Sequence, residues 1–195
     1  LVNAAGNGIE VNSVMETLSG LKVNDRLLEV TIELGSELIN LNDPSQSLKD
    51  SRCLLKNSIS SGKAMEYFSR MVFEMGGPKN FESEWVNYLP QASVVKEIRA
   101  NKVGYIDRID TEVLGQVVVI LGGGRQTESD KIDPSVGLSG LMEIGNKVDL
   151  TIPLAIVHAS NEQDIIRVAA LVRGAFSISY DFRPPPNLIH RLESK

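Results

Sequence analysis

The stretch SVVKEIRANKVGYIDRID, residues 93–110, is where the hydrophobic pattern of this chain changes. Before it, apolar residues recur every three or four positions, as on one face of a helix. Within it they form short β-branched runs on either side of a turn at Asn101, which predicts a hairpin or two consecutive strands. The change predicts an α+β chain with a helical part over residues 1–80 and a compact mixed unit over residues 92–195.

The helical part shows four successive helix patterns with end signals, and the fourth contains methionines that we interpret as core residues rather than a cofactor-binding set. The end signals are Gly20 after the first helix, Asn24 as the cap of the second, Asp43–Pro44 at the start of the third, Gly62 at its end, and Gly76, Gly77 and Pro78 after the fourth. The second helix carries its leucines on one broad face. The join, residues 76–92, is rich in turn residues, and we expect its Trp85 to wedge between the two parts.

The mixed part alternates strands and helices. Residues 110–121, DTEVLGQVVVIL, fit a buried helix or a strand, and the cap residues Asp110 or Thr111 favour a helix. Residues 145–159, GNKVDLTIPLAIVHA, predict two strands with a polar turn. A capping box of Ser160 and Gln163 predicts the next helix, and one more strand is expected after the triple proline near the C-terminus.

Composition excludes several functions. With 195 residues and 42% apolar content, the chain can bury a substantial core, so disorder is not expected. A net charge of -5 and 5% aromatic residues argue against nucleic-acid binding. No apolar run is long enough to span a bilayer, so we expect no membrane partner. The single cysteine, Cys53, is interpreted as a helix residue, and its isolation favours a reducing, cytoplasmic location.

A search for a nucleophile, a base and a charge-stabilising group finds no catalytic set. His158 ends an apolar strand pattern, where a hydrogen-bonded structural histidine is favoured over a catalytic base, and His190 is a weaker candidate still. Asp107 and Asp110 flank Arg108, a pattern more typical of a solvated strand end than of a paired general acid and base.

The glycine-rich stretch VVVILGGGRQTESD, residues 117–130, leaves three alternatives open. It terminates the preceding element, or it forms a loop that closes over a site built elsewhere, or it cradles a phosphate. Gly123 and Gly124 leave backbone N–H groups unobstructed, and Arg125 can clamp an anion with two parallel bonds. A phosphate cradle usually precedes a helix N-terminus, whereas polar turn residues follow here, so termination is favoured first and a closing loop second.

Several motifs together resemble a known family: AAGNGIEV, SGKAMEYFSRMV with GGP, YLPQA, GYIDRIDTEVLGQVVVILGGGR, DKIDPSVGL and PLAIVHA. They resemble the C-terminal part of the bacterial thymidine phosphorylases, in the pyrimidine-nucleoside phosphorylase family, over nearly the whole chain. The resemblance implies that residues 1–80 complete a larger α/β domain and that residues 92–195 are the C-terminal domain. It implies reversible phosphorolysis of thymidine to thymine and 2-deoxyribose 1-phosphate by a pentosyltransferase of pyrimidine salvage, active as a cytoplasmic homodimer.

The same resemblance places the family's glycine-rich phosphate motif and base-contacting residues before Leu1. We therefore expect this chain to be a fragment that has no catalytic residue and is inactive alone, an expectation that its interior-like opening, LVNAAGNGIEV, supports. Substrate and phosphate would bind, and dimers form, through the preceding part, and the resemblance implies that Gly123, Gly124 and Arg125 help the domains close.

The resemblance implies no organic cofactor and one possible monovalent cation, held by the backbone carbonyls of Leu1 and Ala4. Ser13 stands where some relatives carry a glutamate ligand, which predicts weaker binding, and Glu10 and Glu16 are the nearby carboxylates.

Two other functions fit the sequence less well. One is a stand-alone binding or scaffold module, because the strands around NKVDLTIPLAIVHA resemble carrier domains such as biotinyl domains. Those carrier domains require a Met-Lys-Met hairpin, which the sequence lacks. A phosphoribosyltransferase related through the helical part has no comparable C-terminal unit.

Overall fold

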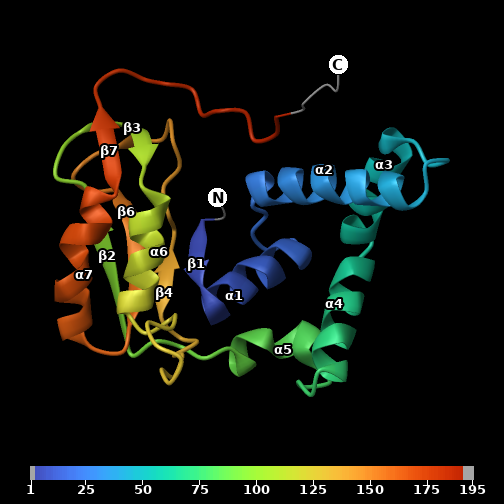
Figure 1. Cartoon of the computed structure of the whole chain (residues 1–195), viewed down its shortest axis with the longest axis horizontal. Helices are drawn as coiled ribbons and strands as arrows, with labels where there is room; N and C mark the ends of the chain where they lie inside the picture. The colour runs from blue at the N-terminus through green and yellow to red at the C-terminus, as the bar shows by residue number, and fades with distance from the viewer. Residues whose placement is uncertain (1–2, 191–195) are drawn as a thin grey trace. The chain divides into compact units, whose positions relative to one another are not determined.

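The computed structural model describes residues 3–190 and shows an α+β fold, as predicted (Figure 1). Internal contacts divide the chain into two units. The first comprises Asn12–Tyr88 and residues 187–190, and the second comprises the described residues up to Val11 together with Leu89–Pro186. The second unit thus takes up the start of the chain, which a division based on hydrophobic period alone assigns to the helical part.

All four helices predicted for the helical part are present, with a fifth after them. They are α1 (Asn7–Leu18), α2 (Asp25–Asn42), α3 (Leu48–Ser60), α4 (Lys63–Glu74) and α5 (Phe81–Tyr88). The predicted cap of α2 is confirmed, because the Asn24 side chain accepts a hydrogen bond of 2.9 Å from the Leu27 N–H. Cys53 lies on α3, as expected, and is exposed.

The predicted start of α3 is wrong by one turn. Asp43 closes α2 instead, since its N–H donates to the Ile39 carbonyl. Its carboxylate accepts from the N–H and the hydroxyl of Ser45, which makes residues 43–47 a turn. The α3 cap is Ser47, whose hydroxyl accepts from the Asp50 N–H at 3.1 Å. Asp43–Pro44 and Ser47 are both good caps, and the geometry of the turn decides between them.

Helices α2 and α3 pack closely because small residues lie where they meet. A Cβ atom at Gly35 would lie 2.9 Å from a methyl group of Leu55. Ser36 and Ser51 are fully buried. Beside them, the Arg52 guanidinium donates to both carboxylate oxygens of Glu33, at 2.6 and 2.7 Å, which fixes the register of the pair.

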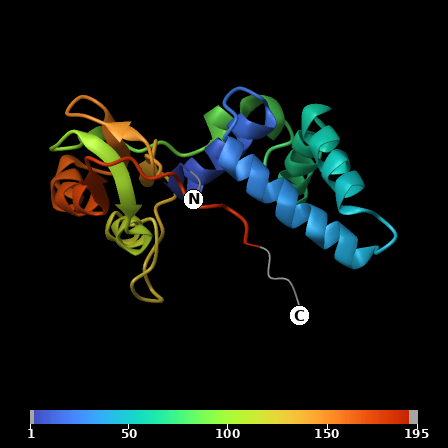
Figure 2. The same ribbon diagram turned by 90° about the horizontal axis from the view of Figure 1, so that it is seen from above.

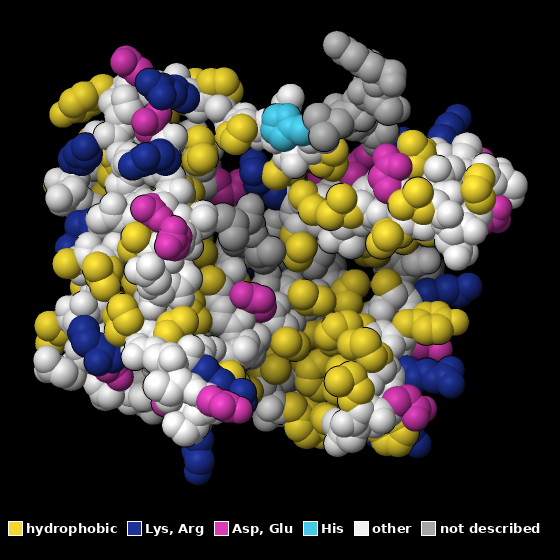
Figure 3. All heavy atoms as spheres, viewed as in Figure 1, with side chains coloured by type: hydrophobic (Ala, Val, Ile, Leu, Met, Phe, Trp, Pro, Cys, Tyr) yellow, Lys and Arg dark blue, Asp and Glu magenta, His cyan; other side chains and the backbone are white. Residues whose placement is uncertain are grey.

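Much of the apolar surface of the helical unit is exposed. Leu34, Leu38 and Leu41 of α2 are 57 to 77% exposed, and Met71 and Met75 of α4 are 49 and 80% exposed. The interpretation of the methionines as core residues is therefore wrong for Met71 and Met75. Figure 3 shows hydrophobic side chains gathered over α4 and α5. A periodic pattern identifies an apolar face but not the partner that covers it.

Helix α5 lies where the sequence suggested only turns. Phe81 and Trp85 are both buried, and their four-residue spacing puts them on one face of the helix. Because α5 is only eight residues long, this helical pattern is weak in the sequence. The Trp85 indole N–H donates to the Asn12 side-chain oxygen at 3.2 Å, so the tryptophan has a partner within its own unit.

The second unit contains two antiparallel sheets. The first has the order β1 (Ala4–Gly6), β4 (Gly137–Ser139), β6 (Pro153–Ala159) and β2 (Val94–Arg99), and the second has the order β5 (Lys147–Val148), β3 (Gly104–Ile109) and β7 (Phe176–Ser179). Strands β2 and β3 confirm the prediction of two consecutive strands, but they lie in different sheets and form no hairpin. Strands β5 and β6 are likewise both present and divided between the sheets.

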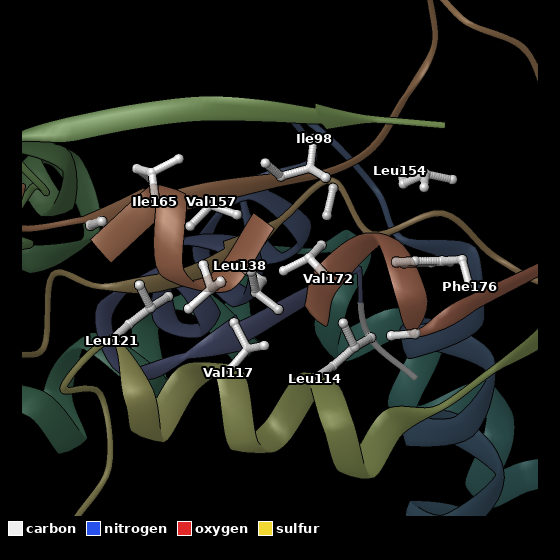
Figure 4. Packing of buried hydrophobic residues seen from close by; sticks show 14 of the residues in the cluster. Ile98, Leu114, Val117, Leu121, Leu138, Leu154, Val157, Ile165, Val172 and Phe176 are labelled. Carbon is white, nitrogen blue, oxygen red and sulfur yellow. The ribbon is translucent and has the colours of Figure 1, made fainter. Parts of the chain in front are cut away.

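Helices α6 (Thr111–Ile120) and α7 (Glu162–Gly174) supply much of the core of this unit. Figure 4 shows apolar side chains of α6 pointing toward those of α7 and the first sheet. The core includes Leu114, Val117 and Leu121 from α6, Ile165 and Val172 from α7, and Ile98, Leu138, Leu154 and Val157 from or beside the first sheet. Residues 111–120 are therefore a helix that buries one face, with Leu114 and Val117 in the core, which resolves the helix-or-strand ambiguity.

The caps of these two helices show one correct and one incorrect prediction. Asp110 caps α6, because its carboxylate accepts from the Val113 N–H at 3.1 Å. For α7 the capping residue is Asn161, whose side chain accepts from the Asp164 N–H at 3.0 Å. The predicted capping box of Ser160 and Gln163 is therefore wrong by one residue. The Ser160 hydroxyl donates instead to the Asp133 carboxylate, at 2.8 Å, so it does not cap the helix.

The C-terminal segment differs from the prediction as well. Residues 187–190 form no strand, and the rest of the predicted strand lies outside the described residues. The unpredicted strand β7 directly follows α7 instead. Phe182 makes an edge-on ring contact with Tyr105, with centroids 5.5 Å apart, and the Arg183 Nε lies 3.1 Å from an Asp107 carboxylate oxygen. These contacts hold the chain after β7 against β3.

Candidate functional site

The glycine-rich stretch is the C-terminal cap of α6. The Gly123 N–H donates to the Val118 carbonyl and the Gly122 N–H to the Val119 carbonyl, which is the Schellman pattern of a helix end. Gly122 has a φ of +97°, a conformation that favours glycine. The glycines thus follow the negative end of a helix, so the geometry disfavours the phosphate-cradle alternative.

The loop after this cap carries its own hydrogen-bond network. One Asp130 carboxylate oxygen accepts from the N–H groups of Gln126 and Thr127, both at 2.9 Å, and the other accepts from the Thr127 hydroxyl at 2.7 Å. These bonds, led by the hydroxyl, hold the pKa of Asp130 below its usual range. The loop projects from the unit beyond α6, in yellow in Figure 2, and Arg125 at its beginning is exposed.

Both ends of the loop are fixed by tertiary bonds. The Asp133 N–H donates to the Gly122 carbonyl at 2.9 Å, which joins the end of the loop to its beginning. The Asn7 side-chain amide donates to the Gly123 carbonyl at 2.8 Å, and the Gly8 N–H donates to the Pro134 carbonyl at 2.9 Å. The residues around Asn7 and Gly8 do not reveal these contacts, because their partners Gly123 and Pro134 lie more than 110 positions away in the sequence.

Of the two residues predicted to offer carbonyls to a cation, Leu1 lies outside the described residues. Ala4 is buried in β1 and is paired with Ser139 of β4. The nearby carboxylates are engaged locally: Glu10 accepts from the Gly6 N–H at 3.0 Å, and Glu16 accepts from the Asn12 side chain at 3.1 Å. Within residues 3–190, no three His, Cys, Asp or Glu side chains form a group able to hold a metal ion.

The carboxylates flanking Arg108 have separate structural partners. Asp110 caps α6, and Asp107 forms the ion pair with Arg183 described above. One Asp107 oxygen is buried and makes no hydrogen bond of good geometry, so the contact with Arg183 is an ion pair rather than a hydrogen bond. This arrangement supports a structural role for both residues and not a paired general acid and base.

His158 is a half-buried residue of β6, and its Nε2 lies 2.8 Å from the Ser139 hydroxyl. This geometry agrees with the structural histidine that the sequence favoured. Burial lowers the pKa of His158 from its usual value, because desolvation disfavours the charged imidazolium.

The lowered pKa predicts a pH dependence of stability. The unfolded chain binds a proton on this residue at a higher pH than the folded chain does. Stability is therefore fully present above about pH 6.5 and falls as the pH drops through the lower pKa of the folded state. We expect melting curves between about pH 7.5 and pH 5.5 to show a smaller loss of stability for His158→Gln than for the wild type. An equal loss in both proteins would contradict this.

The helical unit contains a separate pocket of about 440 Å³ at the ends of α1 and α3. Its lining is largely apolar, and Lys56 is its one charged residue. The hydroxyls of Thr17, Ser19 and Ser60, which also line it, donate to nearby backbone carbonyls. The polar groups that usually orient a ligand are therefore engaged locally in this pocket.

In the described part of the chain, none of the helices is both long and apolar enough to cross a membrane.

The second unit matches a known protein family over most of its length. Residues 105–179, from β3 to β7, match the family model of the pyrimidine nucleoside phosphorylase C-terminal domain. The match spans less than half of the chain, and it supports a relationship to the pyrimidine nucleoside phosphorylase family. The match contains α6, the glycine cap and the Arg125 loop, and it confirms over this range the resemblance seen in the sequence motifs.

Proposed function

We propose that this chain is the C-terminal part of a thymidine phosphorylase, a pentosyltransferase that converts thymidine and phosphate reversibly into thymine and 2-deoxyribose 1-phosphate. The match of residues 105–179 to the C-terminal domain of the family carries the proposal. In this reaction the bond from the sugar to the pyrimidine breaks, a bond from the sugar to phosphate oxygen forms, and the base leaves with the bonding electrons.

Such a reaction depends on positioning and on stabilising charge as it develops. Among the described residues, the carboxylates and histidine considered above are engaged in caps, ion pairs and strand contacts. We therefore place the catalytic groups outside residues 1–195 and assign this chain a supporting and closing role. The exposed Arg125, next to the anchored glycine cap, is the group best suited to contact an anionic or carbonyl partner in the closed enzyme.

The proposal includes the expectations that follow from the resemblance. The enzyme would use phosphate as co-substrate and no organic cofactor, and it would act as a cytoplasmic homodimer through a helical domain outside this chain. A monovalent cation would bind weakly at the carbonyls of Leu1 and Ala4, because Ser13 offers no charge there.

The test compares the complete gene product that contains this chain with residues 1–195 alone. Each is incubated with thymidine or uridine, with and without phosphate, and the released base is measured. We expect phosphate-dependent thymine release by the complete protein and none by residues 1–195.

Each other outcome overturns a stated part of the proposal. No release of either base by the complete protein would leave a non-enzymatic binding or scaffold role. Faster release of uracil than of thymine would overturn the preference for thymidine. Release by residues 1–195 would overturn the placement of the catalytic groups.

A further inference from the structure

The segment of residues 4–8 is built into the second unit at very close range. Gly6 of β1 lies opposite Gly137 of β4. A Cβ at Gly6 would lie 2.8 Å from the Val136 carbonyl oxygen, and one at Gly137 would lie 2.3 Å from the Ala5 carbonyl oxygen. The two backbones therefore lie too close together to admit a side chain at either glycine, which leaves β1 little freedom to move and fixes the position of the next residue, Asn7.

Asn7 is the first residue of α1, and its side chain reaches the glycine cap of α6. The Asn7 Nδ2 donates to the Gly123 carbonyl at 2.8 Å. The adjacent Gly8 N–H donates to the Pro134 carbonyl at the other end of the loop. The junction of β1 and α1 therefore holds both ends of the loop between Gly123 and Pro134.

The part of the loop between these ends is held mainly by its own residues. Asp130 gathers the N–H groups of Gln126 and Thr127, and these bonds need no contact with the rest of the unit. Such a turn can move as one piece, so its direction is set where it is attached.

We propose that Asn7 is a positioning residue, which fixes the direction of the loop that carries Arg125 through its bond to Gly123. The role of Arg125 in closure rests on the proposed function, but the anchoring of the loop by Asn7 does not. The test therefore measures the loop itself, in residues 1–195 and without substrate.

The informative substitution is Asn7→Asp. It keeps the shape of the side chain but replaces the donor with a carboxylate oxygen, which cannot bond to the Gly123 carbonyl. At the first position of α1 a negative charge favours the helix, so a role limited to starting α1 predicts no loss. Asn146→Asp is the matched control, because the Asn146 oxygen accepts from the Glu143 N–H and the carboxylate retains that bond.

Hydrogen exchange of individual amides separates the possibilities. In Asn7→Asp we expect the Gly123 and Asp133 amides to exchange about tenfold faster, the effect of losing roughly one hydrogen bond. The Gln126 and Thr127 amides should keep their rates, because their partner Asp130 moves with them. The α7 amides should not change, and Asn146→Asp should leave all of these rates unchanged.

Two results would overturn the inference. Unchanged rates at Gly123 and Asp133 in Asn7→Asp would show that the side chain does not hold the loop. Equal acceleration in α7 would show a general loss of stability instead of local positioning.

Discussion

Gly137→Ala is expected to lower the free energy of unfolding of the second unit by roughly 3 kcal/mol, and its melting temperature by about 10 °C. Gly137 has a φ of +148°, which a side chain makes costly. The added methyl would also lie 2.3 Å from the Ala5 carbonyl oxygen, a backbone atom. The strain is relieved only if β1 moves away from β4, which would break the pairing of these strands.

The control is the same chemical change at Gly115, in the middle of α6. Apart from its two chain neighbours and the nearby backbone of α6, no described heavy atom lies within 4 Å of a Cβ built there. Alanine also forms helices better than glycine, so Gly115→Ala should raise stability by about 0.5 to 1 kcal/mol. Thermal unfolding of the two variants checks both signs. A loss below about 1 kcal/mol in Gly137→Ala would mean that β1 shifts easily and does not fix the junction that carries Asn7.

Arg125→Ala, made in the complete protein, is expected to lower kcat/KM for thymidine by about tenfold to a hundredfold. The estimate assumes one charge-assisted bond made in the closed state, worth roughly 1.5 to 3 kcal/mol. Contacts that were equal in the open and closed states would shift nothing. The melting temperature should hardly change, because Arg125 is exposed.

Arg108→Ala removes the same charge from an exposed position on β3 and serves as the control. Steady-state kinetics should separate the two variants. Unaltered kinetics in Arg125→Ala would leave the loop as a helix terminator alone. Equal losses in both variants would show a general effect of charge, and a large fall in melting temperature would make Arg125 a structural residue.

The sequence by itself determined most of the helices and strands and several of their ends. Asn24 and Asp110 were recognisable as caps because the bond that defines a cap joins residues three positions apart. The helix end at Gly122–Gly124 is equally local, since its bonds stay within five residues. The family resemblance also came from the sequence, and residues 105–179 confirm it.

The capping residue of α7 was decided by the tertiary structure and not by the local sequence. Asn161 caps α7 because the neighbouring Ser160 is bonded to Asp133, a residue 27 positions earlier. The exposed leucines of α2 are a related case, since a pattern within one helix carries no information about what lies against it.

The candidate site shows the same limit most clearly. Gly123, Gly124 and Arg125 could be selected from the sequence because unobstructed backbone beside a guanidinium has recognisable chemistry. Asn7 could not, because its role depends on a bond to Gly123 across 116 positions and on the opposed glycines of β1 and β4. Local bonds leave a signature in neighbouring residues, whereas contacts between distant segments exist only once the chain has folded and their loop-closure entropy has been overcome.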